Sequence, residues 1–200
     1  MALGTLNDAG RFHIPVERSI RAGLVGALIA LAGCEPVAGP VDGGIETVRI
    51  GDRTFKLELA LTQASRRLGL GGRRTLGPAE GMLFAFPGPA PQRFWMYDCL
   101  MDIDIAYLDP IGYVTAVHTM RAEPPRGPEE DELDYRSRLP GYPSLYPAQF
   151  VIELAPGTFE SLGIEAGDRI LIDADRLEML GEASEDELPD AFAPPGIGQR

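Results

Sequence analysis

Two aspartates and a histidine are the side chains in this chain with the types and spacing for chemistry. Asp102 and Asp104 stand two residues apart, about 7 Å along a strand, and His118 follows them in the sequence. Such a group permits general acid–base catalysis or metal binding, and Asp104 and His118 are the candidate catalytic residues. The alternative is that the aspartates lie on a solvated strand face and that His118 is a satisfied histidine at a sheet edge.

Aromatic residues precede these aspartates in residues 93–113, the stretch around which we expect the chain to be arranged. Residues 94–97 are predicted to form a strand, whose successive side chains point to opposite faces. Phe94 and Met96 suit the core, whereas the polar atoms of Trp95 and Tyr97 need partners. Trp95 is nevertheless expected to be substantially buried, together with residues 81–86. The predicted binding patch consists of Trp95, Tyr97, Asp98, Asp102, Tyr142 and Ser144.

Charge and motifs disfavour several classes of function. The formal net charge of −12 repels phosphate backbones, so we expect no nucleic-acid partner. No GxSxG, HExxH, P-loop or dinucleotide-binding fingerprint occurs. A serine hydrolase is supported only by the presence of Ser144 and His118. The only other histidine is His13, which rules out a histidine-rich metal centre, and we predict neither a metal nor a cofactor.

The turn at residues 109–112 determines whether the catalytic candidates meet. Its aspartate, proline and glycine occupy the first, second and fourth positions of a type I turn, which suits a three-residue hairpin loop with a glycine bulge. In that register residue 109 faces residue 113, and Asp104 lies opposite His118. A two-residue loop would instead place Asp104 opposite Val117, because a slip of one residue moves every side chain to the other face.

Hydrophobic periodicity and turn residues predict the remaining elements. Residues 87–91 are rich in proline and are expected to end the strand before them, because proline has no N–H to donate. Strands are predicted at residues 47–50, 55–61, 81–86, 94–97, 102–108, 149–154 and 169–173. Short helices are predicted at residues 63–70, closed by Gly71 and Gly72, and at residues 156–162, followed by Gly163.

Two further segments carry expectations of their own. Residues 121–147 form a long loop, which we expect to act as a flap beside the Trp95 strand, although a freely varying insertion is the alternative. Residues that would pack the flap are Tyr135, Leu139, Tyr142, Leu145 and Tyr146. The second segment is a basic island on this acidic chain, which is either a solvated helix face or a contact for an anion. It comprises Arg66, Arg67, Arg73 and Arg74.

The N-terminus has the features of a targeting segment. Arg18 and Arg21 precede an apolar run at residues 22–32, which is too short to span a membrane because a spanning helix needs about 20 residues. A basic flank, a short apolar core and small residues after it are typical of a secretory signal peptide. Residues 31–34 (Leu-Ala-Gly-Cys) resemble the bacterial lipobox, which implies cleavage before Cys34 and lipid on its thiol. An ordinary signal peptide, or a buried helix with an incidental cysteine, is the alternative.

Several motifs occur in the order seen in the DUF192 (UPF0127) family, over residues 47–173. They are residues 81–86 (GMLFAF), 94–96 (FWM), Leu100, 104–109 (DIAYLD), Gly112, 142–144 (YPS), 151–157 (VIELAPG), 162–164 (LGI) and 167–170 (GDRI). The resemblance implies a small β-rich, jelly-roll-like sandwich, often secreted or lipid-anchored, and implies no reaction. The chain departs from the family pattern at Asp98 and Cys99, which stand in place of Asn-Thr, at Asp102, in place of proline, and at Gly71, in place of methionine.

Together these observations predict a mainly β, antiparallel sandwich at residues 45–178. A lipoprotein signal peptide at residues 1–33 and a flexible tether at residues 34–44 precede it, and an acidic disordered tail at residues 179–200 follows. The expected function is that of an envelope lipoprotein, anchored on the extracytoplasmic side through Cys34, which binds a small ligand or an envelope protein. The alternative is a hydrolase or lyase that uses Asp104 and His118.

Overall fold

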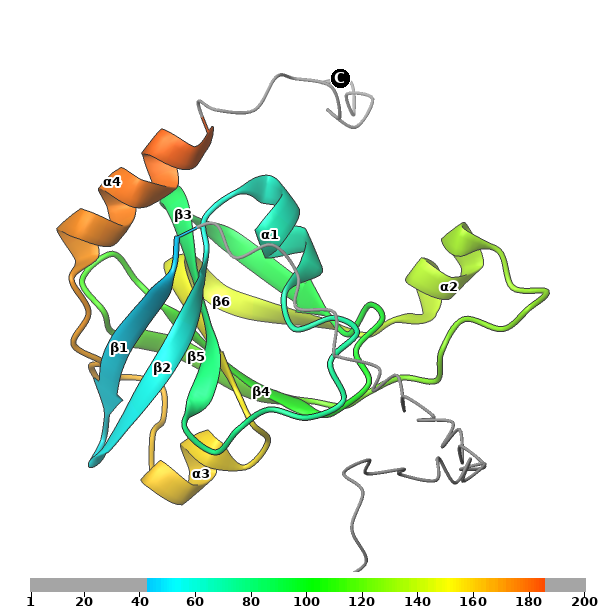
Figure 1. The fold of residues 1–200 in the computed structure, drawn as a ribbon, viewed down its shortest axis with the longest axis horizontal. Helices are drawn as coiled ribbons and strands as arrows, with labels where there is room; N and C mark the ends of the chain where they lie inside the picture. Colours follow the sequence, from blue (N-terminus) through cyan, green and yellow to red (C-terminus); the bar gives the residue numbers. More distant parts are fainter. Residues whose placement is uncertain (1–42, 186–200) are drawn as a thin grey trace, which may run out of the picture. The chain divides into compact units, whose positions relative to one another are not determined.

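The computed structural model describes residues 43–185 (Figure 1). The predicted signal peptide, Cys34, the tether up to residue 42 and the predicted tail after residue 185 lie outside the described residues. Within residues 43–185, none of the helices has the length and apolar character that crossing a membrane requires.

The strands of the described region form a single mixed sheet in the order β1-β2-β3-β6-β4-β5. Neighbours pair antiparallel except β2 and β3, which are parallel. The predicted mainly β class is confirmed, while the arrangement is one curled sheet with a parallel pair. The strands are β1 (Ile45–Ile50), β2 (Arg53–Ala60), β3 (Glu80–Trp95), β4 (Ile103–Leu108), β5 (Val114–Met120) and β6 (Gly141–Leu154), and the helices are α1 (Gln63–Leu68), α2 (Glu132–Arg138), α3 (Thr158–Leu162) and α4 (Ala174–Glu185).

The sheet is buried on both faces at its centre. Side chains alternate between faces along a strand, so each central strand contributes to two clusters. The first core cluster includes Leu83, Ala106 and Ile152, and α3 and α4 add Phe159 and Leu177 to it. The second core cluster, on the other face, includes Phe84, Ile105, Tyr107 and Val151. Every residue of β4 is therefore buried. This includes Asp104, so its side chain does not lie on a solvated strand face.

The strand that begins at Glu80 continues through the proline-rich stretch, contrary to the prediction that it ends there. Pairing between β3 and β6 is irregular between Ala85 and Ala90 and between Pro91 and Arg93. Proline has no N–H to donate, which interrupts the ladder, but the pairing with β6 resumes at Ala90 and Pro91. Inside the irregular part, the Ser144 hydroxyl accepts a hydrogen bond of 3.0 Å from the backbone N–H of Gln92.

The β4–β5 hairpin has the predicted turn and a different register. The backbone N–H of Asp109 donates to the carbonyl of Tyr113 at 2.9 Å, as the three-residue loop requires. A second irregularity then follows, because Leu108 pairs with Val114 whereas Tyr107 pairs with Ala116. The unpaired residue between these partners shifts the register by one, so Asp104 lies opposite Thr119 rather than His118 or Val117. Both predicted pairings of Asp104 are wrong.

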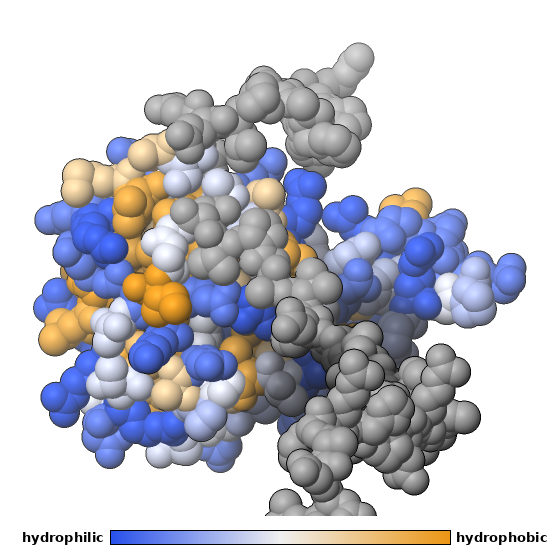
Figure 2. Space-filling model, viewed as in Figure 1, coloured by the Kyte–Doolittle hydropathy of each residue, from blue (hydrophilic) through white to orange (hydrophobic). Residues whose placement is uncertain are grey.

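Residues 121–147 contain regular structure that the sequence did not reveal. They include α2, capped by the Asp131 side chain, which accepts from the backbone N–H of Asp134 at 2.8 Å, and the first half of β6. Figure 1 shows α2 at the end of the domain away from α4, and in the view of Figure 2 the α2 segment is mainly hydrophilic. Of the residues predicted to pack the flap, Tyr135 and Leu139 are buried, whereas Leu145 and Tyr146 are exposed.

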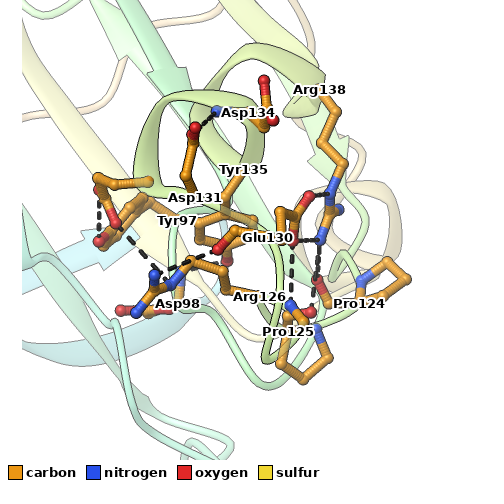
Figure 3. A network of polar contacts seen from close by, with 12 residues as sticks. Tyr97, Asp98, Pro124, Pro125, Arg126, Glu130, Asp131, Asp134, Tyr135 and Arg138 are labelled. Carbon is orange, nitrogen blue, oxygen red and sulfur yellow. Dashed lines mark hydrogen bonds and ion pairs between the residues drawn. The ribbon is translucent and has the colours of Figure 1, made fainter.

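The flap docks beside the end of β3, as predicted. Tyr97 donates from its hydroxyl to Glu132 at 2.9 Å, and the Tyr135 hydroxyl accepts from the backbone N–H of Asp98 at 3.1 Å. The two tyrosine rings lie 5.3 Å apart. Within the flap, the Arg138 guanidinium donates to the Glu130 carboxylate at 2.6 Å and to the carbonyl of Pro124 (Figure 3).

The C-terminal part differs from the prediction in two respects. Residues 169–173 form no strand, and only Arg169 makes an isolated bridge, to Tyr113. The chain then enters α4, which extends to Glu185 and contacts β3, so the predicted disordered tail is wrong for residues 179–185. Leu177 of this helix is fully buried in the first core cluster, and Leu180 packs against that cluster. These contacts explain why the segment folds despite its acidic composition.

Candidate functional site

A pocket of about 340 Å³ opens between α1 and the second half of β3. Its apolar lining includes four aromatic side chains, Phe84, Phe86, Phe94 and Trp95, together with Leu68 and Leu70. Phe84 and Phe94 meet edge to face with their ring centroids 5.1 Å apart. Phe84 and Leu70 are buried and form the floor, whereas Leu68 and Trp95 are exposed at the mouth. A concave, mainly apolar site with a few polar groups is the usual form of a small-ligand site.

Glu153 is the titratable group on the floor of this pocket. It is 4% exposed, and one of its carboxyl oxygens, Oε2, has no hydrogen-bond partner among residues 43–185. Burial raises the pKa of Glu153 to about 8, which the backbone N–H of Leu70 and the charge of Arg73 oppose. The carboxyl group is therefore mostly protonated at pH 7, and Glu153 is among the residues that line the pocket.

The position of Glu153 follows from the register of β6 and from the end of α1. Glu153 pairs with Met82 of β3 and Ile105 of β4, so its side chain points to the face that carries the second core cluster. α1 ends at Gly69, whose φ of 53° suits glycine because other residues are strained there. The chain turn after Gly69 directs the N–H of Leu70 at the carboxyl. The predicted end of this helix, at Gly71 and Gly72, was two residues too late.

Cys99 lines the same pocket, and its thiol forms no disulfide within residues 43–185. Burial, and then the nearby carboxyl of Glu153 and the charge of Asp98, raise its pKa to about 12. The thiolate is the nucleophilic form of cysteine, so at neutral pH this side chain is a weak hydrogen-bonding group and part of the wall. The raised pKa disfavours a nucleophilic role for Cys99.

Arginines surround the mouth of the pocket. Arg66, Arg67 and Arg93 line it, and Arg67 and Arg93 are exposed to solvent. Arg66 donates to the carbonyls of Leu61 and Ala85 and stacks over Phe86 at 5.0 Å. Part of the predicted basic island thus lies at the pocket. Arg73, which also belongs to the island, does not line the pocket. Its guanidinium forms a bidentate pair with Glu58 at 2.6 Å.

The predicted binding patch divides between this pocket and other places. Trp95 and Tyr97 line the pocket. Trp95 is 46% exposed, contrary to the prediction of substantial burial, because it lies near the end of β3 where only Gly141 pairs with it; Arg136 of α2 stacks over its ring at 5.9 Å. Asp98 adjoins a neighbouring hollow beside Gly71 and Gly72. Phe94 and Met96 pack in the core as predicted.

The other three residues of the predicted patch line neither the pocket nor the neighbouring hollow. Asp102 pairs with Arg121 at 2.5 Å and accepts from the backbone N–H of Ala122 at 2.8 Å; these hydrogen bonds lower its pKa. Ser144 is buried, and its hydroxyl donates to the carbonyl of Tyr146. Tyr142 packs at the margin of the second core cluster. The six residues therefore do not form one surface.

The candidate catalytic residues lie on opposite faces of the sheet. Asp104 belongs to the face of the first core cluster, where its carboxylate accepts from the Thr119 hydroxyl at 2.8 Å and from the backbone N–H of Phe159 at 3.1 Å. His118 lies on the other face, 2.8 Å from the carbonyl of Pro143 and beside the Tyr142 ring. The predicted acid–base pair is wrong, because the extra residue in β5 separates its two members.

The arrangement suits binding better than bond cleavage. A buried neutral carboxyl, a protonated thiol and aromatic walls can enclose an apolar body, and arginines at the mouth can hold an anionic group. Among residues 43–185, no group of three or more His, Cys, Asp or Glu side chains is arranged to hold a metal ion.

The sequence contained a signal for this site that the sequence reasoning did not use. Glu153 interrupts an otherwise apolar run at residues 150–154 (FVIEL). An ionisable residue inside a strand that reads as buried on both faces must be neutralised, paired or functional. The aromatic walls had no such signal, since Phe84 and Phe86 read simply as core.

Comparison with known proteins places this fold in context. The model of the DUF192 family, described as an uncharacterized ACR, matches residues 46–172. No curated protein matches the chain. The chain is similar to a crystal structure from Sinorhizobium meliloti 1021, described as a "putative transcription regulator", with 29% identity, 64% of this chain and 90% of that chain covered, and a TM-score of 0.50. It is also similar to a protein of unknown function from Novosphingobium aromaticivorans DSM 12444, with 28% identity, coverage of 70% and 94%, and a TM-score of 0.52.

Proposed function

This chain belongs to the DUF192 family, and we propose that it is a binding protein of the bacterial cell envelope, lipid-anchored through Cys34, whose pocket between α1 and β3 holds a small amphipathic anion. One observation carries the proposed binding function. The pocket combines an apolar, aromatic interior with arginines at its mouth, on a chain whose formal net charge is −12. A local basic cluster on an acidic protein attracts anions selectively to that place.

The positions of the titratable groups favour binding over catalysis. Hydrolysis or elimination by general acid–base chemistry needs two groups within reach of one substrate. Asp104 and His118 lie on opposite faces, and the Asp104 carboxylate is occupied by Thr119 and by the backbone of α3. Glu153 and Cys99 share the pocket, but the raised pKa of each keeps both mostly protonated at neutral pH.

The pocket itself provides the reporter for a binding test. Trp95 is the only tryptophan in the chain and lines the mouth, so a ligand that enters should change its fluorescence. Titration of the purified full-length chain with 3-phenylpropionate, an aromatic ring that carries a carboxylate, should give a saturable change. The double substitution Arg67→Gln and Arg93→Gln should weaken this binding about tenfold, because each exposed charge–carboxylate contact contributes up to about 1 kcal/mol.

A matched control uses an arginine away from the pocket. Arg49 of β1 is exposed and donates to the carbonyl of Gly51, so Arg49→Gln removes one arginine charge without touching the site. Its affinity for 3-phenylpropionate should equal that of the wild type. An unchanged Trp95 signal across the titration, or an equal loss in Arg49→Gln and in the double variant, would overturn the proposed binding function.

The anchor rests on the lipobox-like order of residues 31–34. Two or more acyl chains give stable attachment to a bilayer, because each buried CH₂ contributes about 0.8 kcal/mol. We expect Cys34→Ala to move the protein from the membrane fraction to the soluble fraction of a bacterial host or to block its processing. Cys99→Ala is the control, since it removes the other cysteine and should leave membrane partition unchanged. Unchanged partition and mass in Cys34→Ala would refute the anchor.

A further inference from the structure

We propose that the ligand of the pocket is a hydroxylated aromatic carboxylate, whose hydroxyl group hydrogen-bonds to the Glu153 carboxyl while its carboxylate meets the arginines at the mouth. This inference rests on the binding function proposed above and adds the chemical class of the ligand. It follows from three features of the pocket: its walls, its mouth and its floor.

The walls favour an aromatic ring. Phe84, Phe86, Phe94 and Trp95 all line the pocket, and the rings of Phe84 and Phe94 meet edge to face. Aromatic rings prefer such offset or edge-to-face neighbours. The pocket volume of about 340 Å³ lies at the small end of ligand sites, which suits one ring with short substituents.

The mouth favours a carboxylate. Arg67 and Arg93 are exposed, so an anion beside them keeps part of its hydration and avoids the cost of burying an unpaired charge. Guanidinium groups bind carboxylates through two parallel hydrogen bonds. The orientation of the ligand is therefore set, with its charged end outward and its ring inward.

The floor favours a neutral polar group at the inner end of the ring. Oε2 of Glu153 is buried and has no hydrogen-bond partner within the described part of the chain, although buried polar atoms normally have one. A ligand hydroxyl can both donate to this carboxyl and accept from it, so it satisfies the group in whichever orientation its proton takes. A ligand that lacks the hydroxyl leaves the carboxyl unsatisfied and should bind more weakly.

A cationic group at the same place is disfavoured. The charged groups nearest the floor include Arg73, and Arg66, Arg67 and Arg93 line the pocket above it. An ammonium group would approach these guanidinium charges and would have to ionise Glu153 against the effect of burial. The pocket should accordingly prefer a hydroxyl over an amine at the inner end of the ligand.

Two probes that share the phenylpropionate skeleton and differ only in a hydroxyl group test the inference. The purified full-length chain is titrated with 3-phenylpropionate and with 3-(4-hydroxyphenyl)propionate, and the affinities are obtained from Trp95 fluorescence or, where the phenol absorbs, from calorimetry. We expect the hydroxylated probe to bind about tenfold more tightly, because it satisfies a buried group that is otherwise unpartnered. The amine analogue, 3-(4-aminomethylphenyl)propionate, should bind more weakly than either.

Two substitutions assign the preference to Glu153. Glu153→Met removes the carboxyl and keeps an apolar side chain of similar length, so the two probes should then bind equally. Glu153→Gln keeps a donor and an acceptor in the same place and should retain most of the preference. Equal binding of both probes to the wild type would overturn the ligand class and leave the binding function standing. A preference that survives in Glu153→Met would also overturn it, whereas binding of neither probe would overturn both proposals.

Discussion

The free energy of unfolding is expected to fall as the pH rises from about 5 to about 8, and Glu153 is the cause. Its pKa is about 8 in the folded chain, against an ordinary value of 4.5. Below pH 4.5 both states hold the proton and the contribution is fully present. Between the two values the unfolded chain releases the proton and the folded chain keeps it, so stability declines by up to about 1.4 kcal/mol per pH unit. The decline ends once the pH exceeds the folded pKa.

Denaturant unfolding between pH 5 and pH 9 measures this effect. Glu153→Gln keeps the shape of the side chain and has no proton to lose, so its stability should be nearly constant over the same range. Other groups near Glu153 do not titrate in this window, because Arg73 stays charged beside Glu58 and burial raises the pKa of Cys99 to about 12. Parallel profiles for the wild type and Glu153→Gln would show that Glu153 is ionised in the folded state.

Replacement of Asp104 by alanine is expected to destabilise the domain strongly, by about 3 kcal/mol. The carboxylate is 1% exposed and accepts from the Thr119 hydroxyl and the backbone N–H of Phe159. Phe159 lies in the first turn of α3, whose N-cap is Gly157 and has no side-chain cap. Asp104 of β4 therefore supplies the acceptor that this helix end lacks. Its loss leaves the buried backbone N–H of Phe159 without an acceptor, at a cost of about 1–3 kcal/mol, and it also removes the hydrogen bond from Thr119, an exposed residue.

Asp102→Ala is the matched comparison for Asp104→Ala. Asp102 stands two residues away and pairs with Arg121, whose side chain is 73% exposed. Exposed ion pairs contribute about 0–1 kcal/mol, and the hydrogen bond from the partly buried N–H of Ala122 adds about 0.5–1.5 kcal/mol, so Asp102→Ala should destabilise the domain less than Asp104→Ala. Urea unfolding of both variants gives the difference directly. Equal destabilisation by the two substitutions would contradict the capping role of Asp104, and loss of 3-phenylpropionate binding by folded Asp104→Ala would contradict its placement outside the pocket.

The local pattern of the sequence predicted most of the strands correctly. The alternation in residues 55–61 places Phe55, Leu57 and Leu59 on one buried face, because a strand presents every second residue to the same side. The turn at residues 109–112 and Gly163 after α3 also occur as predicted. The family resemblance covered nearly the same residues as the matching family model.

Tertiary structure decided the register, the burial of the carboxylates and the site. One unpaired residue in β5 moved His118 away from Asp104, and no local rule predicts such a bulge inside a strand. Tertiary packing also explains why residues 179–185 are helical. The helix α4 contacts β3 and packs its leucines against the first core cluster.

The pocket depends on contacts between residues distant in the sequence. The sequence by itself contains the parts of the pocket. It places a lone carboxylate, Glu153, in an apolar strand, arginines after residue 62 and aromatic residues after residue 83. Only the parallel pairing of β2 with β3 and the central place of β6 brought α1, β3 and Glu153 to one cavity. Strand order is set by the total burial of apolar surface over the whole sheet, which no single stretch of sequence contains.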